Sequence, residues 1–324
     1  MVASKAEGES RAGVDFTHLD DPLFDGAGAT KRDLVEYLDG VRDRIVPVLE
    51  NRPLSVIRVH RGQEAFMQKN VPKYTPEFVP TVTIWSESSK RDVAYALCND
   101  RRTLLWFANQ RAVEYHPALT RVEDPAYLTH LVLDLDPPEG EHFAMAVRAA
   151  HLVRQALADV GLEGAVKTSG AKGVHVFVPI EKVPWEDAAA ATRAIAAKAE
   201  SIDPDLATTA FMKEDRGGRV FVDATRTGGA TVVAAYSPRV RPGTPVSYPV
   251  GWDDLDAVTP ADFTVHSALD RLGAADPWAS QMPAAQAMPP ELLEEGHAIP
   301  VARVQAMHEG KRRARARRKE SPSG

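Results

Sequence analysis

The amino-acid sequence predicts an α+β protein whose central part is a ferredoxin-like β-α-β-β-α-β unit. Short apolar runs typical of buried strands recur between residues 131 and 223, and two longer segments with helical spacing separate them. Hydrophobic residues make up 44% of the 324-residue chain and charged residues 26%, which is typical of a globular protein with a sizeable core. We therefore expect one domain over residues 15–300, with this unit at about 131–250.

The first part of the chain predicts an N-terminal α/β lobe packed against that unit. Residues 1–14 are small and polar, so we expect them to be disordered. A helix is predicted from Thr30 onward, because apolar residues follow at helical spacing. Residues 54–60 and 79–85 alternate in polarity as strands do, and residues 100–115 have a helical pattern.

The central unit has the order strand, helix, strand, strand, helix, strand. Its elements are expected at residues 131–136, 141–160, 165–168, 174–178, 185–201 and 219–223. Gly170 and Gly173 predict a tight turn between the second and third strands. In this topology the first strand lies between the third and the fourth. Polar side chains on those three strands are therefore expected to lie close together.

Three aspartates on these strands predict a metal site. Asp134 and Asp136 are two residues apart on the first strand, so both side chains leave the same face. Asp223 ends the fourth strand, which neighbours the first. Carboxylates this close repel each other unless a cation neutralises them, and oxygen ligands suit a pair of hard divalent cations. An Asp-x-Asp pair is also common at an ordinary strand end, but the third aspartate favours metal binding.

The turn and the third strand carry donors for an anionic ligand. Ser169 and Lys172 belong to the turn, and His175 follows on the strand next to the carboxylates. Hydroxyl, ammonium and imidazole donors at this place can hold a triphosphate beside metal ions. The alternative for His175 is a purely structural role, which is common for a lone histidine on a strand.

Arg239 and Arg241 alternate on an extended segment after the fourth strand, so both are expected to point to one side. Arginine there suits the binding of phosphate groups. The alternative is a solvated strand edge. The Pro-rich segment 276–300 that follows is interpreted as a wrap around the domain.

The overall composition excludes several classes of protein. No apolar run reaches the roughly 18 residues that a membrane span requires, and the N-terminus lacks the apolar core of a signal peptide. The single cysteine, Cys98, excludes an internal disulfide framework. We therefore expect a cytoplasmic protein without a membrane partner.

The charge of the chain is unevenly distributed. The net charge is −6, yet seven basic side chains lie within residues 311–319 of the C-terminal tail, residues 301–324. Binding to nucleic acid depends on the phosphates that a local basic surface contacts, so the net charge does not exclude it. The tail is expected to be disordered, either as a nonspecific DNA-binding arm or as a solvated appendage.

Several motifs together resemble the polymerase domain of bacterial ligase D, which belongs to the archaeo-eukaryotic primase superfamily. They are THLDDPLFDGAGATKRDLVEYL, LVLDLDPPEG, KTSGAKGVHVFVPI and RVFVDATRTGGATVVAAYSPRVRPGTPVSYPVGWDDL. The resemblance covers roughly residues 15–260 and implies a primase-polymerase fold with its catalytic core at about 131–250. The chain begins with Met1 and carries no ligase or nuclease module, so we expect a stand-alone actinobacterial primase-polymerase such as those associated with ligase C.

The resemblance also implies roles for individual residues. The metal ligands would be Asp134, Asp136 and Asp223, with Mn²⁺ often favoured over Mg²⁺. The nucleoside triphosphate would be held by Ser169, Lys172, His175, Arg239 and Arg241, with His116 of VEYHPAL near the sugar and Phe66 stacked on the base. DNA contacts are expected at Lys31, Lys69 and Arg226, with Lys31 on the 5′-phosphate of a gap. Asp21 stands where a lysine is common, which predicts a weak preference for that phosphate.

The function implied is a DNA-directed nucleotidyl transferase that fills short gaps or extends broken ends in non-homologous end joining. It would use a two-metal mechanism, prefer ribonucleotides, and work with a DNA ligase and Ku on nucleoid DNA. Two alternatives remain open: a metal-dependent nuclease and a non-catalytic module that binds DNA ends. The predicted triphosphate residues disfavour the first alternative, and the intact aspartate triad disfavours the second.

Overall fold

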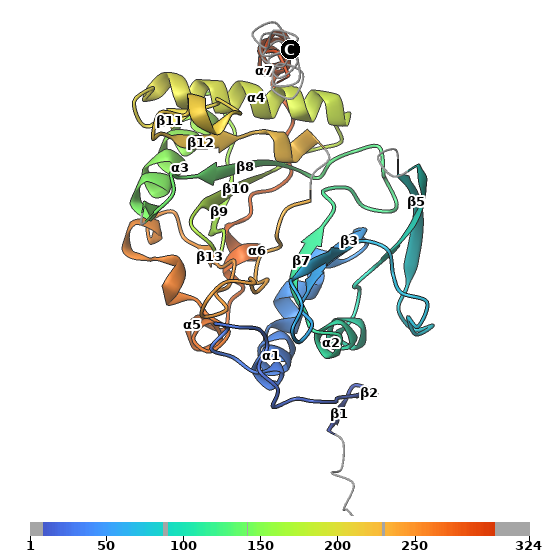
Figure 1. Cartoon of the computed structure of the whole chain (residues 1–324). Coiled ribbons are helices and arrows are strands. Elements are labelled where there is room, and N and C mark those ends of the chain that lie inside the picture. Colours follow the sequence, from blue (N-terminus) through green and yellow to red (C-terminus); the bar gives the residue numbers. More distant parts are fainter. Residues whose placement is uncertain (1–8, 87–89, 141, 229–230, 302–324) are drawn as a thin grey trace, which may run out of the picture.

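The structure is a computed structural model that describes residues 9–86, 90–140, 142–228 and 231–301 (Figure 1). A six-stranded sheet with helices on one side lies next to an N-terminal lobe, and one continuous hydrophobic core joins the two. The predicted α+β class, with a β-α-β-β-α-β unit packed on an N-terminal α/β lobe, is confirmed.

The six-stranded sheet contains the predicted central unit. Its elements are β8 (His130–Asp136), α3 (Phe143–Ala158), β9 (Ala165–Thr168), β10 (Val174–Pro179), α4 (Trp185–Ile202), β11 (Ala207–Thr208), β12 (Val220–Asp223) and β13 (Pro249–Val250). The spatial order is β11-β12-β8-β10-β9-β13, and every neighbouring pair is antiparallel except β11 with β12. The first strand of the unit, β8, therefore lies between β10 and β12, as predicted.

Two helical layers cover one side of this sheet (Figure 1). Helices α3 and α4 pack directly on the strands, and α7 (Pro290–Ala298) packs on the outer side of α4. The two helices approach very closely at Gly296, where a Cβ atom would lie 2.0 Å from the carbonyl oxygen of Ala190. Only glycine allows this contact. The helices leave the other face of the sheet to the N-terminal lobe and to the polar residues of β8, β10 and β12.

The N-terminal lobe has a smaller sheet and two helices. Its elements are β1 (Ser10–Arg11), β2 (Val14–Asp15), α1 (Lys31–Leu49), β3 (Leu54–Arg58), β4 (Phe66–Gln68), β5 (Thr81–Ser86), β6 (Arg91–Ala96), α2 (Arg101–Asn109) and β7 (Ala112–Pro117). The sheet order is β4-β3-β6-β5, and β7 also pairs with β3. A capping box begins α1, in which the Thr30 hydroxyl accepts from the Asp33 backbone and the Asp33 carboxylate accepts from the Thr30 backbone.

The prediction of a helix over residues 100–115 was only half right. Helix α2 ends at Asn109, Arg111 has a φ of +58°, and β7 begins at Ala112. All residues of β7 are buried, including Glu114 and His116, which alternate with Val113 and Tyr115. This alternation is typical of a strand, so the sequence itself carried a signal for β7.

The expected disorder of residues 1–14 was also wrong for its last part. Ser10–Arg11 and Val14–Asp15 pair as a small antiparallel hairpin. Val14 is buried, as is Phe16 directly after the hairpin, and their burial anchors this segment to the lobe. Residues 1–8 lie outside the described residues, and so does the basic tail apart from Val301.

The last part of the chain wraps around the domain. Its short helices are η3 (Leu255–Ala257), η4 (Pro260–Asp262), α5 (Ala268–Arg271) and α6 (Pro277–Gln281), and two further turns, η1 (Lys213–Asp215) and η2 (Thr225–Gly228), flank β12. No helix in the described part of the chain is long and apolar enough to cross a membrane.

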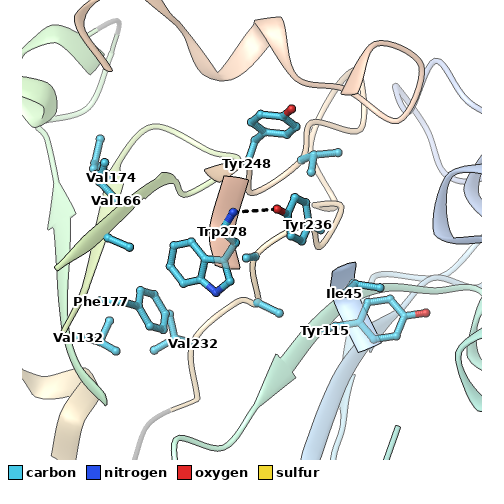
Figure 2. Close-up of a cluster of buried hydrophobic side chains, with 14 of the residues drawn as sticks. Ile45, Tyr115, Val132, Val166, Val174, Phe177, Val232, Tyr236, Tyr248 and Trp278 are labelled. Carbon is cyan, nitrogen blue, oxygen red and sulfur yellow. Dashed lines mark hydrogen bonds between the residues drawn. The ribbon is translucent and has the colours of Figure 1, made fainter. Parts of the chain in front are cut away.

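An aromatic cluster fills the space between the sheet and the N-terminal lobe (Figure 2). Trp278 of α6 packs edge-to-face on Phe177 of β10, with 5.3 Å between the ring centroids. Its backbone N–H donates to the Tyr236 hydroxyl (3.1 Å), and the Tyr37 hydroxyl of α1 donates to the Tyr236 carbonyl (2.8 Å). The segment around Tyr236 thus connects the two parts of the molecule.

Candidate active site

The sheet register brings three of the predicted site residues into one row. Asp134 on β8 lies directly opposite His175 on β10 and directly opposite Asp223 on β12. Directly opposite residues in antiparallel strands point to the same face. The Nε2 atom of His175 lies 3.1 Å from Oδ1 of Asp134. Asp136 follows two residues after Asp134, so it adds a third carboxylate to this face.

Arg226 of η2 lies against this row. Its Nε donates to Oδ2 of Asp134 (2.9 Å) and lies 3.4 Å from Oδ2 of Asp223. Burial alone would raise the pKa of Asp134, but the His175 contact and the Arg226 guanidinium lower it below its usual value. Asp134 is therefore ionised. Arg226, predicted as a DNA contact, is instead held by the carboxylates.

Nearby positive charges offset the negative charge of Asp136 less than they offset that of Asp134. Burial, followed by the negative charge of Asp134, raises the pKa of Asp136 to about 6. The positive charges of Lys172 and Arg226 lower the pKa too little to cancel these effects. A cation that binds next to Asp136 would therefore stabilise its ionised form.

The donor set fits a divalent cation that prefers oxygen ligands, such as Mn²⁺ or Mg²⁺. Among the described residues, however, no group of three His, Cys, Asp or Glu side chains is already arranged to hold a metal ion. Arg226 explains this, because its guanidinium contacts both Asp134 and Asp223. A cation bound between these two carboxylates would take the place of the guanidinium.

The turn between β9 and β10 forms one edge of the site. The Ser169 backbone N–H donates to the Gly173 carbonyl (2.9 Å), and the Ser169 hydroxyl accepts from the Gly173 N–H (3.1 Å). Gly170 has a φ of +67°, and a Cβ atom on Gly173 would lie 2.3 Å from the Leu135 carbonyl oxygen. Both positions therefore require glycine, as the sequence indicated. The Lys172 ammonium lies 3.4 Å from the exposed Glu139 carboxylate.

Glu114 on β7 is a buried acid that sequence reasoning missed. One carboxylate oxygen accepts from the Val240 backbone N–H (2.8 Å), and the other lies 2.9 Å from His116 Nε2 and 3.1 Å from Arg239 Nε. Although burial opposes ionisation, the contacts with His116 and Arg239 lower the pKa of Glu114 to about 2. The one signal in the sequence was an acid within the buried run Ala112–Pro117, two residues before His116.

Lys167 on β9 is a second residue that was missed. It lies directly opposite His175, its side chain is completely buried, and its Nζ lies 2.8 Å from His175 Nδ1. Burial, followed by the positive charge of Lys167, lowers the pKa of His175 to about 4. Burial also places the pKa of Lys167 well below its usual value. His175 is therefore a neutral imidazole held between Lys167 and Asp134.

These side chains surround a cavity of about 990 Å³. The predicted residues that line it are Asp134, Asp136, Ser169, Lys172, His175, Arg226, His116, Arg239 and Arg241. Glu114 lines it as well, and Asp223 adjoins it through Asp134. The cavity lies between the sheet and β7 of the N-terminal lobe, so both parts of the molecule build it.

Besides Asp223, three predicted residues do not line this cavity. Phe66 on β4 is exposed and stacks on His60, and Lys69 is exposed just after β4. Lys31 is only 2% exposed, and its Nζ donates to the Thr17 carbonyl (2.5 Å) and the Asn109 side chain (2.7 Å). The structure thus contradicts the expectation that Lys31 contacts DNA, because burial and these internal hydrogen bonds occupy its ammonium group.

Comparison with known proteins identifies the family to which this arrangement belongs. The family model of the LigD primase-polymerase domain matches residues 30–278, which is more than half of the chain. The chain belongs to the LigD primase-polymerase domain family. Proteins of this family are nucleotidyltransferases, so the family and enzyme class predicted from the sequence are confirmed.

Individual relatives agree with this assignment. The bifunctional non-homologous end joining protein LigD of Bacillus subtilis is 33% identical over 267 residues, covering 80% of this chain and 42% of the relative. The multifunctional protein LigD of Mycolicibacterium smegmatis is also 33% identical over 267 residues, covering 80% of this chain and 34% of the relative. The chain therefore spans less than half the length of these relatives.

A solved structure matches the fold. The polymerase domain of Mycobacterium tuberculosis ligase D in complex with DNA superimposes with a TM-score of 0.74 at 30% sequence identity. The match covers 83% of this chain and 99% of that domain. The LigD-type primase-polymerase domain therefore makes up most of the described chain.

Proposed function

We propose that this chain is a DNA-directed polymerase of the primase-polymerase type, which fills short gaps or extends broken ends and prefers ribonucleotides. The observation that carries the proposal is the cavity of about 990 Å³, which is lined by Asp134 and Asp136 and by several cationic side chains. A growing strand end and a nucleoside triphosphate both carry negative charge, and both need to reach the carboxylate row. The cationic groups oppose that charge on the sides of the cavity.

The triphosphate is held on the turn side of the cavity. Ser169 and Lys172 offer a hydroxyl and an ammonium group there, and His175 would offer its Nε2–H, which lies against Asp134 Oδ1 while no triphosphate is bound. Arg241 is exposed and lines the same cavity, where its guanidinium can donate a forked pair of hydrogen bonds to a phosphate group. Lys172 can leave its exposed ion pair with Glu139 and bind the phosphate, because an exposed ion pair contributes little free energy.

The sugar is held by His116. Glu114 fixes the His116 ring through Nε2, so the other ring nitrogen is the one directed to a ligand. A ribose 2′-hydroxyl is both a donor and an acceptor, and a ring nitrogen can bond to it directly. This contact supports a preference for ribonucleotides, since a deoxyribose offers no partner at that position.

A divalent cation, Mn²⁺ or Mg²⁺, completes the site. Asp134, Asp136 and Asp223 would hold it, and one or two bound ions would neutralise the triphosphate and activate the attacking 3′-hydroxyl. The protein's own contribution is the orientation of these carboxylates, which the sheet register and the buried His175 contact provide. We expect manganese to support a faster reaction than magnesium, which requires a more regular octahedral oxygen shell.

The proposed setting is the repair of DNA ends in the bacterial cytoplasm, on nucleoid DNA. The relatives from Bacillus subtilis and Mycolicibacterium smegmatis are named for non-homologous end joining, and the matched Mycobacterium tuberculosis domain was solved with DNA. A DNA ligase and Ku are the partners that such a role requires. The exposed Phe66 on β4 is proposed to stack on the base of the bound nucleotide, and the exposed Lys69 to contact the DNA backbone.

The test is extension of a labelled primer on a gapped duplex, with ribonucleotides or deoxyribonucleotides and with manganese or magnesium. We expect extension that needs a nucleotide and a divalent cation, is faster with ribonucleotides, and is lost in Asp134→Asn. Shortening of the primer without nucleotide would identify a nuclease. Binding of the duplex without any extension would identify a non-catalytic module, and either result would refute the proposal.

A further inference from the structure

The buried ammonium group of Lys167 is the feature that the proposed function leaves unused. Its side chain has no exposed surface, and its two hydrogen-bond partners are His175 Nδ1 (2.8 Å) and the Ser247 hydroxyl (2.5 Å). Neither partner is a carboxylate. Burying a lysine without a compensating acid is costly, so its presence next to a site residue calls for an explanation beyond packing.

We propose that Lys167 is a positioning residue that fixes the tautomer of His175. By donating to Nδ1, Lys167 keeps the ring proton on Nε2, the nitrogen that faces Asp134 and the cavity. A neutral imidazole carries one proton, so the partner of one nitrogen decides whether the other is a donor or an acceptor. This inference rests on the proposed function, in which His175 has to donate to a triphosphate.

The contact on the other side of the ring supports the same tautomer. The Oδ1 atom of the Asp134 carboxylate lies 3.1 Å from His175 Nε2, and a carboxylate oxygen accepts hydrogen bonds. Nε2 therefore carries the proton. The remaining nitrogen, Nδ1, has a lone pair and needs a donor, which the Lys167 ammonium supplies.

Ser247 sets the direction of this chain of hydrogen bonds. Its hydroxyl donates to the Thr168 carbonyl oxygen (2.9 Å), so its only proton is already used. Towards Lys167 the hydroxyl can only accept. Lys167 consequently donates to both Ser247 and His175, and the protons point in one direction from β9 through His175 to Asp134.

The position of Lys167 follows from the sheet. Lys167 and His175 are direct register partners on β9 and β10, and the Phe177 ring lies 5.5 Å from the Lys167 ammonium. The lysine side chain is therefore confined on the same face as the site, below the level of the cavity. It does not line the cavity and has no contact with a substrate, so it acts only through His175.

Two neutral variants separate the hydrogen bond from packing. Lys167→Met removes the donor and keeps an unbranched side chain, whereas Lys167→Gln keeps an N–H donor. We expect Lys167→Met to lower kcat about 10–100-fold, as is usual when a group that orients a site histidine is removed. The decrease in kcat should be several-fold smaller in Lys167→Gln, although this variant removes the same charge.

The tautomer is measured directly by NMR of the ¹⁵N-labelled imidazole rings in the full chain. His175 is one of ten histidines and is assigned by the signal that disappears in His175→Gln. We expect a protonated Nε2 and an unprotonated Nδ1 in the wild type, and a mixture of tautomers in Lys167→Met. This readout needs no polymerase activity, so failure of the proposed function and failure of this inference are distinguishable.

A double-mutant cycle tests whether Lys167 acts through His175. In a His175→Ala background, Lys167→Met should have little further effect on extension, because the group that it positions is gone. Additive losses would overturn the proposal, and so would an unchanged Nε2–H signal together with full activity in Lys167→Met. If Lys167→Met does not fold, Ser247→Ala removes the second partner of Lys167 and is expected to give a smaller change of the same kind.

Discussion

Asp134 and Asp223 are direct register partners on neighbouring strands, and the Arg226 guanidinium contacts both carboxylates. The sheet therefore places two negative charges side by side before any ligand is considered. Their repulsion is a cost to the fold, and a cation at this point, either the guanidinium or a metal ion, offsets it. The first two predictions follow from this arrangement.

Asp136→Asn is expected to abolish nucleotide addition and to stabilise the metal-free protein. The pKa of Asp136 is raised to about 6, so the folded state binds this proton more tightly than the unfolded state does. Its ionisation therefore reduces stability as the pH rises through about 4 to 6. The melting temperature of the variant should exceed that of the wild type by roughly 2–5 °C at about pH 8.

The pH dependence provides the control for this prediction. Near pH 4 the wild-type Asp136 is protonated, and the difference in melting temperature should disappear. Asp253→Asn, at a side chain that is 97% exposed, should change the melting temperature at neither pH. A constant difference at all pH values would show that the repulsion is not the cause.

Arg226→Gln is expected to destabilise the metal-free protein and to strengthen the binding of manganese. Without the guanidinium, Asp134 and Asp223 repel each other unopposed, and a metal ion no longer competes with an internal cation. Calorimetric titration should show manganese affinity rising about tenfold, and the melting temperature should rise more on adding manganese than it does for the wild type. Weaker manganese binding in the variant would mean that Arg226 supports the metal ion instead of competing with it.

Glu114→Gln is expected to raise the KM for the nucleotide about tenfold or more, with a smaller change in kcat. Glu114 holds both His116 and Arg239, so losing its charge releases the sugar contact and leaves the arginine without its partner. Steady-state extension with a nucleotide titration measures both constants. Glu139→Gln is the matched control, because Glu139 borders the same cavity as an exposed acid and should leave the KM nearly unchanged.

Lys31→Met is expected to change stability and not DNA recognition. The buried ammonium group of Lys31 donates to the Thr17 carbonyl and to the Asn109 side chain, so its loss removes both hydrogen bonds and should lower the melting temperature by roughly 1–3 °C. Lys69→Met, at an exposed lysine, should show the reverse: an unchanged melting temperature and weaker binding to gapped DNA. A selective loss of discrimination between 5′-phosphorylated and 5′-hydroxyl gaps in Lys31→Met would restore the original role of Lys31.

The sequence was sufficient for the central unit because its signals were local. The polarity patterns of the strands, together with the order of the elements, predicted that β8 lies between β10 and β12, and hence that Asp134, His175 and Asp223 meet. Gly170 and Gly173 predicted the turn because their backbone positions exclude a Cβ atom.

The residues that were missed or misplaced depend on contacts between distant segments. Lys31 and Lys69 are both lysines in polar surroundings in the sequence, and only the fold shows that Lys31 is covered by the residues before α1 and by Asn109. Glu114 and Lys167 stand within buried strands, where a charged residue is uncommon. A charged residue in a buried strand indicates a special role. The roles of Glu114 and Lys167 became clear only from the fold, which places His116 and Arg239 next to Glu114 and His175 next to Lys167.

The position of Trp278 has a consequence for how the chain folds as it is synthesised. Its indole covers Phe177, and α7 covers α4, so the last described segment closes surfaces formed by residues that leave the ribosome much earlier. Until that segment emerges, the nascent chain exposes apolar surface at the junction of the two lobes. The domain therefore completes its core only after α6 and α7 have been synthesised, and a premature stop before residue 276 leaves a product that chaperones and proteases recognise.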